Sequence, residues 1–168
     1  TLEAVKNHPH MKAKLGPNQG RGMACGFWFN FGGQTCVDIN IGTDGTVSLA
    51  LGTVDVGGAR ASMSLICAEE LGIPYEQVKA TVADTSTLGH NDTTEGSRGT
   101  FSSGMATIFA AREAIGQLKA RAAKMWGIPV EAVEWSDGSA TAVGDEHSNL
   151  ADLSLQEIAA ASPGTGGP

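Results

Sequence analysis

The stretch from Gly52 to Ser62 constrains the fold more than any other, because a strand pattern there runs into adjacent glycines and then into a helix pattern. Gly57 and Gly58 allow the sharp turn that such a junction needs. The first N–H groups of the helix that follows lack intrahelical acceptors and carry the positive end of the helix dipole. The turn is therefore predicted to be able to receive an anion such as a phosphate.

A second turn of this kind is predicted between Thr93 and Thr100, where Gly96 and Gly99 interrupt a run of hydroxyl side chains. Side-chain and main-chain donors there can converge on phosphate or carbonyl oxygens, whereas a helix cap uses only one or two of them. A hydroxyl-rich capping loop explains the composition equally well, so both interpretations stay open. The six hydroxyl residues are Thr93, Thr94, Ser97, Thr100, Ser102 and Ser103.

The first turn matches no established nucleotide-binding pattern. Arg60 stands where a dinucleotide-binding loop has its last glycine, and no Gly-Lys-Ser/Thr follows. A tight strand-to-helix connection is a sufficient and more common explanation for the glycine pair. A net charge of -7 without a Lys or Arg cluster argues against nucleic acid and anionic membranes as partners. An anion site must therefore be local, made of backbone amides and a few cations such as Arg60 and Arg98.

Short apolar segments bounded by turn residues predict a sheet of about five or six strands. Alternating apolar and polar residues indicate strands with one covered face, and Asp-Gly pairs between neighbouring segments indicate hairpins. The segment 22–31 is instead apolar and aromatic on both parities, which is typical of a strand covered on both sides. The predicted strands span 22–31, 37–41, 47–51, 78–82, 131–135 and 139–143.

Apolar residues at helical spacing predict two main helices, over 59–71 and roughly 99–126, each followed by a glycine and a proline. A capping box at Ser154 opens a short helix that runs to Ala161. The expected fold class is α+β, with a mixed, largely antiparallel sheet and two main helices packed on it as a two-layer sandwich.

The chain of 168 residues is long enough for one domain with its own core. Residues 1–20 are predicted to be a polar lead-in with at most a short helix, residues 21–161 the domain, and residues 162–168 a Gly/Pro-rich tail or linker. Because it starts without a methionine, we expect an excised domain or a processed subunit. Three cysteines without CxxC spacing and no secretory leader favour a cytoplasmic setting, and no apolar run suits a membrane span.

Two further groups of residues allow alternative functions. Asp84, His90 and Asp92 offer ligands suited to a hydrolytic metal site, but their spacing matches no dedicated loop, and a turn-rich loop is the simpler interpretation. The aromatic residues 27–29 are typical of a core strand, and stacking against a flat aromatic substrate is the other interpretation.

The order and spacing of these segments resemble the molybdenum-binding large subunit of the xanthine dehydrogenase and aldehyde oxidase family, which includes carbon monoxide dehydrogenase and aromatic hydroxylase subunits. The resemblance covers roughly residues 20–161. The segments that carry it are Asp44-Gly45-Thr46-Val47, Gly52-Thr53-Val54-Asp55-Val56-Gly57, Ala68-Glu69-Glu70-Leu71-Gly72-Ile73-Pro74 with Val78, Asp84-Thr85, and Thr94-Glu95-Gly96-Ser97-Arg98-Gly99-Thr100.

The resemblance implies an internal segment of a longer subunit that holds molybdopterin with molybdenum, in bacteria often as the cytosine dinucleotide form. In that family the molybdenum takes its ligands from the pterin, so no protein metal ligand is expected here. Iron–sulfur and FAD groups lie on other domains or subunits, which are the expected partners together with the rest of the large subunit. The implied cofactor contacts are Gly57 and Gly58 at the first turn and Gly96, Ser97 and Thr100 at the second, with Phe27 near an aromatic wall of the substrate pocket.

The sequence departs from the family pattern in two ways. Gly58 stands where the family usually has the glutamine of Gly-Gln-Gly, which removes a side-chain donor. The family's general-base glutamate belongs to a glycine-rich motif that residues 1–168 do not contain. No catalytic residue is therefore assigned, and the fragment alone is expected to be inactive. The implied chemistry of the full subunit is hydroxylation of an aldehyde or N-heteroaromatic substrate with oxygen from water. The alternative is a non-catalytic scaffold that has lost cofactor contact.

Overall fold

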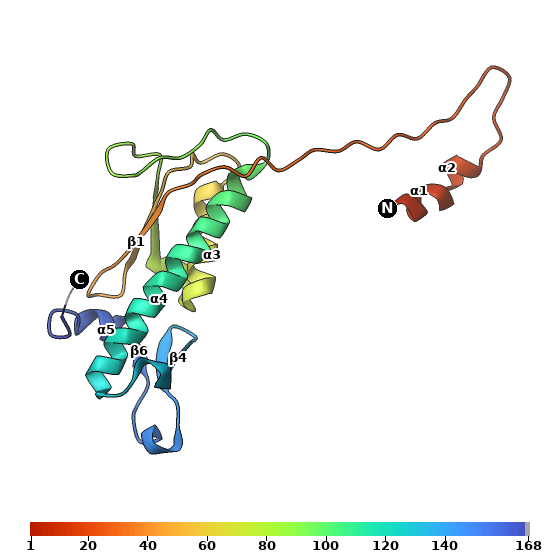
Figure 1. The fold of residues 1–168 in the computed structure, drawn as a ribbon. Helices are drawn as coiled ribbons and strands as arrows, with labels where there is room; N and C mark the ends of the chain where they lie inside the picture. Colours follow the sequence, from red (N-terminus) through yellow and green to blue (C-terminus); the bar gives the residue numbers. More distant parts are fainter. Residues whose placement is uncertain (167–168) are drawn as a thin grey trace.

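The computed structural model describes residues 1–166, in which a long amino-terminal extension leads into the helices and sheets (Figure 1). The extension begins with two short helices, α1 (Leu2–Asn7) and α2 (Pro9–Lys12), where at most one was expected. Residues 13–36 then run to the body without forming a helix or strand. The lead-in is therefore separated from the body by extended chain.

The strand predicted over 22–31 is not formed, which corrects the sequence interpretation. Every residue from Gly22 to Phe31 is exposed, including Phe27 at 90% and Trp28 at 71%. The indole of Trp28 stacks on Phe29 with 5.9 Å between ring centroids. Apolar residues at both odd and even positions favour burial of a segment, but a strand also requires a neighbouring strand to which its backbone can hydrogen-bond. In the described residues this segment pairs with neither of the two sheets.

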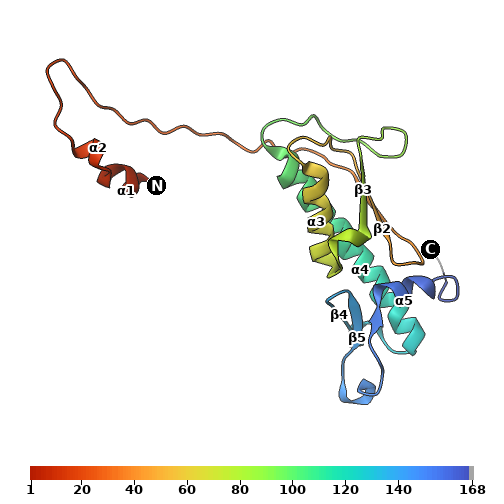
Figure 2. The same cartoon turned by 180° about the vertical axis from the view of Figure 1, so that it is seen from behind.

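The first sheet has the order β1-β2-β3 and positions the candidate site. β1 (Val37–Ile41) and β2 (Val47–Leu51) form the predicted antiparallel hairpin, and β3 (Val78–Val82) pairs with β2 in parallel. The side chains of Val47, Leu49 and Leu51 are buried on one face of β2. On the sheet, α3 (Ala59–Leu71) packs against β3 and β2, and α4 (Gly104–Trp126) packs against β1 (Figure 2).

The remaining strands form a second sheet, so the prediction of one five- or six-stranded sheet was wrong, although the α+β class is confirmed. β4 (Val133–Ser136), β5 (Ser139–Ala142) and the two-residue β6 (Leu153–Ser154) pair antiparallel in that order. The 23 residues of α4 make a helix about 35 Å long, which carries the chain away from the first sheet before the second hairpin begins.

The second sheet contacts the carboxyl-terminal end of α3, the helix that packs on the first sheet. The indole N–H of Trp135 donates to the Leu71 carbonyl at 3.0 Å. Gly72 and Gly138 approach so closely that a Cβ on Gly72 would lie 2.5 Å from the Gly138 nitrogen. α5 (Leu155–Ala160) begins at the predicted capping box, in which the Ser154 hydroxyl and the Glu157 carboxylate bond each other's backbone N–H groups. Short 3₁₀ turns occupy Tyr75–Gln77, Val130–Ala132 and Asp145–His147.

The end of the described chain lies against α4. Arg121 donates to the Thr165 hydroxyl at 3.1 Å and to the Gly166 carbonyl at 3.2 Å, and Lys124 donates to the Thr165 carbonyl. Of the predicted tail 162–168, residues 162–166 are thus hydrogen-bonded to the body, and 167–168 lie outside the described residues. Within residues 1–166, none of the helices combines the length and apolar character that crossing a bilayer requires.

Candidate functional site

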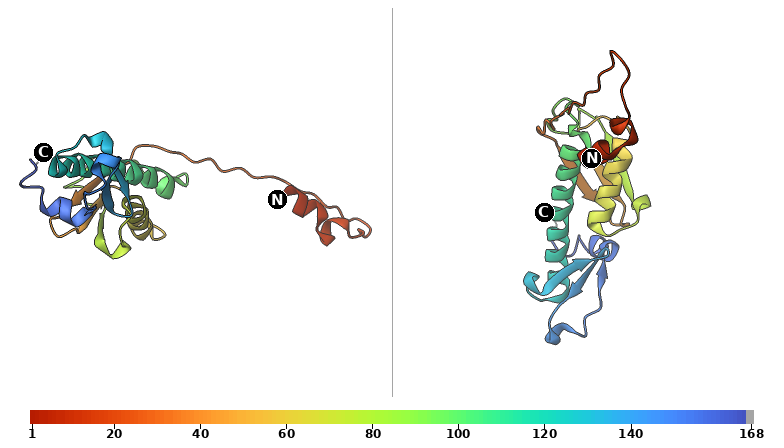
Figure 3. Two further views of the ribbon diagram at one scale, coloured as in Figure 1. Left: turned by 90° about the horizontal axis from the view of Figure 1, so that it is seen from below. Right: turned by 90° about the vertical axis from the view of Figure 1, so that its right-hand side faces the viewer.

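The two predicted turns lie side by side because β2 and β3 are parallel. Leu51 and Val82, the last residues of these strands, are register partners, so the chain leaves both strands at the same edge of the sheet. In open sheets of parallel strands, this edge is where ligands usually bind. One connection leads from β2 to the start of α3, and the other leads from β3 to the start of α4 (Figures 1 and 3).

A pocket of about 320 Å³ separates the two turns. Ser97 and Thr100, which the sequence singled out, line it, whereas Gly57, Gly58 and Gly96 are neighbours of lining residues. The sequence prediction missed the apolar side of the pocket, although those residues belong to the stretch between β2 and α3. The first turn contributes Thr53, Val54, Val56 and Ala59, and the second contributes Thr94, Ser97, Gly99 and Thr100.

The first turn owes its shape to two left-handed glycines. Gly57 has φ +63° and Gly58 has φ +78°, and a Cβ at either position would meet no atom within 4 Å. Backbone conformation, and not crowding, therefore requires glycine here. The carboxylate of Asp55 accepts the N–H of Arg60 at 3.0 Å and also pairs with the Arg60 side chain at 3.3 Å. The start of α3 thus already holds an internal anion, and Arg60 is engaged with it.

The second turn is held in shape by the end of the extended segment. Gly96 and Ser97 have φ +52° and +57°, and such values are uncommon for serine. The Phe31 N–H donates to the Gly96 carbonyl at 3.0 Å, and the Asn30 side chain donates to the Ser97 carbonyl at 2.8 Å. A Cβ on Gly96 would lie 2.5 Å from the Cβ of Phe31. Glycine is therefore required here by both conformation and close approach.

The main chain of the second turn has two N–H groups that are free to bind an anion. Consecutive N–H groups around left-handed residues form a concave surface that favours anions. Among residues 1–166, the N–H groups of Gly96 and Ser97 have no intramolecular acceptor. The turn leads into a π-helical turn (Gly99–Ser103) ahead of α4, where sequence periodicity predicted one continuous helix. This wider turn is a feature that occurs often at functional sites.

Arg98 is not a cation available to a ligand, which corrects its predicted role. Its side chain is only 1% exposed and takes part in no ion pair within the described chain. The guanidinium instead joins two loops that meet behind the second turn, and it holds them against the start of α4. Its acceptors are the carbonyl oxygens of Gly32, Gln34, Asp92 and Thr93 and the hydroxyl of Thr35.

The six hydroxyls of this region have different roles. Only Thr94, Ser97 and Thr100 line the pocket, and their hydroxyls make no hydrogen bond within the described chain. The Ser102 hydroxyl donates to the Gly32 carbonyl at 2.7 Å. The Ser103 hydroxyl is buried without a hydrogen-bond partner among residues 1–166. Half of the predicted set therefore lines the pocket and is available to a ligand there.

The residues considered for a metal site stabilise the loop after β3. Asp92 accepts the Gln34 N–H at 2.6 Å and contacts His90 at 2.9 Å, and the first of these bonds contributes most to holding its pKa below the usual value. Hydrogen bonds from Ser86, its hydroxyl first, likewise lower the pKa of Asp84. No group of three or more potential metal ligands occurs in the described part of the chain.

Comparisons with known proteins agree with this architecture. The family model for the molybdopterin cofactor-binding domain matches residues 3–166. The carbon monoxide dehydrogenase large chain of Hydrogenophaga pseudoflava is 31% identical over 122 residues, which are 71% of this chain and 15% of that protein.

Solved structures show the same fold. The crystal structure of the Cu,Mo-CO dehydrogenase in its carbon monoxide reduced state matches with TM-score 0.69 and 29% identity, over 76% of this chain and 16% of that one. Quinoline 2-oxidoreductase from Pseudomonas putida 86 matches with TM-score 0.65 over 80% of this chain and 17% of that one, at 19% identity. The chain thus spans about one sixth of the length of these relatives.

Proposed function

The chain belongs to the molybdopterin cofactor-binding domain family, and on that premise we propose that it is an internal segment of the large subunit of a molybdenum hydroxylase. The cofactor of this family is molybdopterin with molybdenum. The observation that carries the proposal is the pocket between the two turns, because it places unpaired hydroxyls opposite an apolar wall at the ligand-binding edge of the sheet.

The residues present fit one end of such a cofactor. A volume of about 320 Å³ lies at the lower end of the range for ligand pockets, which suits a phosphate or pyrophosphate group with part of the pterin. Ser97 and Thr100 would donate through hydroxyls and Gly96 through its N–H, while Val54 and Val56 would cover an apolar face of the ligand. When bound, the cofactor supplies two-electron oxidation chemistry, and these residues bind and orient it.

The first turn contributes less than the second in this proposal. Gly58 stands at the family's glutamine position and has no side-chain donor, so Gly57 and Gly58 would offer only main-chain N–H groups. Asp55 also places a carboxylate at the start of α3, which disfavours a second anion there. The same observation favours the alternative function, a scaffold domain in which cofactor contact has been lost.

The proposal also covers the complete enzyme that would contain this chain. We assign it hydroxylation of an aldehyde or N-heteroaromatic substrate, the cytosine dinucleotide form of the cofactor, iron–sulfur and flavin partner subunits, and a cytoplasmic setting. The exposed ring of Phe27 would reach the substrate pocket only when other parts of the subunit surround it. The base glutamate would come from another part of the subunit, so this chain alone would be inactive.

A titration of the chain with molybdopterin cytosine dinucleotide, followed by calorimetry, tests the proposal. Hydrogen bonds to charged groups contribute about 1.5–3 kcal/mol, so Ser97→Ala or Thr100→Ala is expected to weaken binding by about 10- to 100-fold. Thr93→Ala is the matched control, because Thr93 lies in the same loop but not in the pocket lining. Gly58→Gln is expected to strengthen binding by restoring a side-chain donor, and to lower the free energy of unfolding because residue 58 has φ +78°.

The outcomes separate the two functions. Saturable binding that Ser97→Ala weakens and Thr93→Ala leaves unchanged supports the cofactor site. If neither the original chain nor Gly58→Gln binds the dinucleotide, the scaffold function is favoured. Equal losses in Ser97→Ala and Thr93→Ala would show that the pocket is not the site.

A further inference from the structure

β1 leaves one edge of the first sheet open. It is the outer strand in the order β1-β2-β3. The Gly52 N–H donates to the Cys36 carbonyl, and the Gly42 N–H donates to the Thr46 carbonyl, which fixes the phase of this antiparallel ladder. In an antiparallel ladder, every second residue of a strand bonds the partner strand with its N–H and C=O groups. The residues between them point these groups away from the partner strand. The residues whose N–H and C=O groups point away from β2 are Val37, Ile39 and Ile41.

A groove runs beside this open edge. It has a volume of about 420 Å³, and all five residues of β1 line it. Successive side chains of a strand point to opposite faces of the sheet. Because both the odd-numbered and the even-numbered residues of β1 line the groove, it lies at the edge of the sheet and not over one face. α4 forms its other side, where the small side chains of Ala110 and Ala114 leave room beside the strand. A further strand would lie about 4.8 Å from β1.

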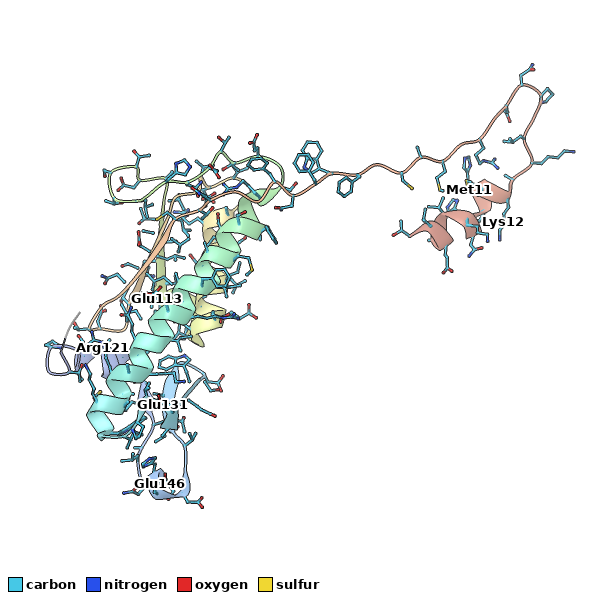
Figure 4. The ribbon with its side chains drawn as sticks, viewed as in Figure 1. Met11, Lys12, Glu113, Arg121, Glu131 and Glu146 are labelled. Atoms are coloured by element: carbon cyan, nitrogen blue, oxygen red, sulfur yellow. The ribbon has the colours of Figure 1, made fainter. Side chains whose placement is uncertain are left out.

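The charge of the groove is acidic. Asp38 on β1 and Glu113 on α4 both line it, and Figure 4 shows Glu113 and Arg121 along the same helix. Arg121 also lines the groove and keeps its positive charge, but its guanidinium is turned to the Thr165 hydroxyl and the Gly166 carbonyl, so the two carboxylates leave the lining with an excess of one negative charge. A strand that fills the groove would therefore be favoured by a Lys or Arg side chain close to Glu113 on the α4 side or close to Asp38 on the opposite face of the sheet.

We propose that this groove receives an extended strand from another part of the same large subunit, with alternating apolar residues and at least one basic side chain. The inference rests on the proposed function, in which the chain is a segment of a longer subunit, as its 15% coverage of the carbon monoxide dehydrogenase large chain suggests. Main-chain groups on an open edge recognise extended polypeptide by strand addition. A second copy is disfavoured, because each copy carries a net charge of -7 and would bring its own acidic groove.

Hydrogen exchange at the amides of Val37, Ile39 and Ile41 tests the inference. In this chain alone the three amides are expected to exchange at least about 100-fold faster than that of Leu49 on the central strand. In the complete large subunit they are expected to become as slow as Leu49. Rapid exchange in the complete subunit would overturn the inference. Amide exchange that becomes slower in this chain alone as the protein concentration rises would also overturn the inference, because it would identify a second copy as the occupant of the groove.

A matched pair of substitutions on α4 supplies a second measurement. Ala114→Trp fills the groove, whereas Ala120→Trp places the same side chain on an exposed part of the same helix. Ala114→Trp is expected to keep the edge amides rapidly exchanging in the complete subunit, and Ala120→Trp to leave them protected. Identical protection in both variants would count against strand addition. Molybdenum content of the same preparations reports on the proposed function separately, because edge protection does not depend on the cofactor pocket.

Discussion

Substituting alanine for Gly96 and for Gly58 separates two requirements that the turns impose on glycine. Both residues have positive φ, +52° for Gly96 and +78° for Gly58. A Cβ on Gly58 would meet nothing within 4 Å, whereas a Cβ on Gly96 would lie 2.5 Å from Phe31 Cβ. Gly58→Ala therefore changes only backbone preference, and Gly96→Ala adds a steric overlap. The difference between the variants measures the contact with Phe31.

The expected magnitudes follow from these distances. A left-handed alanine costs about 1–2 kcal/mol, and the reduced freedom of the unfolded chain returns about half of that, so Gly58→Ala should lower the free energy of unfolding by about 1 kcal/mol. In Gly96→Ala the exposed segment at Phe31 can move aside. The added cost is then limited to the hydrogen bonds from Asn30 and Phe31 to the turn, about 1 kcal/mol each. Gly96→Ala should lower the free energy of unfolding by about 3 kcal/mol.

Urea unfolding followed by far-ultraviolet circular dichroism measures both values, and limited proteolysis reports on residues 20–31 directly. Gly96→Ala should have the lower urea midpoint and should be cleaved faster in that segment, while Gly58→Ala keeps the original cleavage rate. Equal midpoints together with equal cleavage rates would refute the reasoning, because they would show that the contact between Gly96 and Phe31 does not hold the segment on the turn.

Three further predictions concern buried or loop-stabilising groups. Arg98→Lys should lower the free energy of unfolding by about 2–3 kcal/mol in urea titrations, because one ammonium cannot bridge both loops; an unchanged value would contradict the bridging role. Burial raises the pKa of Cys67 from 9.0 to about 11, so the unfolded thiol ionises first and stability should fall as the pH rises from 9 to 11, by at most about 2–3 kcal/mol. Cys67→Ala should remove that pH dependence, and a thiol reagent should modify exposed Cys25 but not Cys67 in the folded chain. The hydrogen bond from the Gln34 N–H lowers the pKa of Asp92, so the Asp92 carboxylate stabilises the folded chain at neutral pH, and this stabilisation should be lost as acid protonates the carboxylate. Asp92→Asn should therefore make the free energy of unfolding less dependent on pH in the acid range. An unchanged pH dependence would contradict this role of Asp92.

Elements with local signals were predictable from the sequence. The hairpin over 37–51, the helix 59–71 with its terminal glycine, and the capping box at Ser154 each depend on residues within a few positions of one another, and all three are confirmed. The family relationship was also predictable, because the spacing of short segments reflects the order of strands and turns. These features require no knowledge of distant contacts.

Features that depend on distant contacts were not predictable. The segment 22–31 has the composition of a buried strand, but only a partner strand would allow it to pair. Arg98 looked like a ligand cation because its acceptors on residues 32–35 lie more than sixty positions away in the sequence. Only one side of the pocket lining had a signal in the sequence: composition pointed to the hydroxyl-rich loop and the family resemblance to Ser97 and Thr100, while the valines opposite them required the parallel register.

The exposed aromatic residues 27–29 affect how such a chain is made in the cell. They leave the ribosome before the core-forming residues of α3 and α4, and at 5–20 residues per second the remainder of the body takes about 7 to 27 s to synthesise. During that interval, and after the core closes, Trp28 and its neighbours remain accessible to chaperones that bind apolar segments. The exposure of this apolar segment therefore ends when it finds a partner, and not when the core folds.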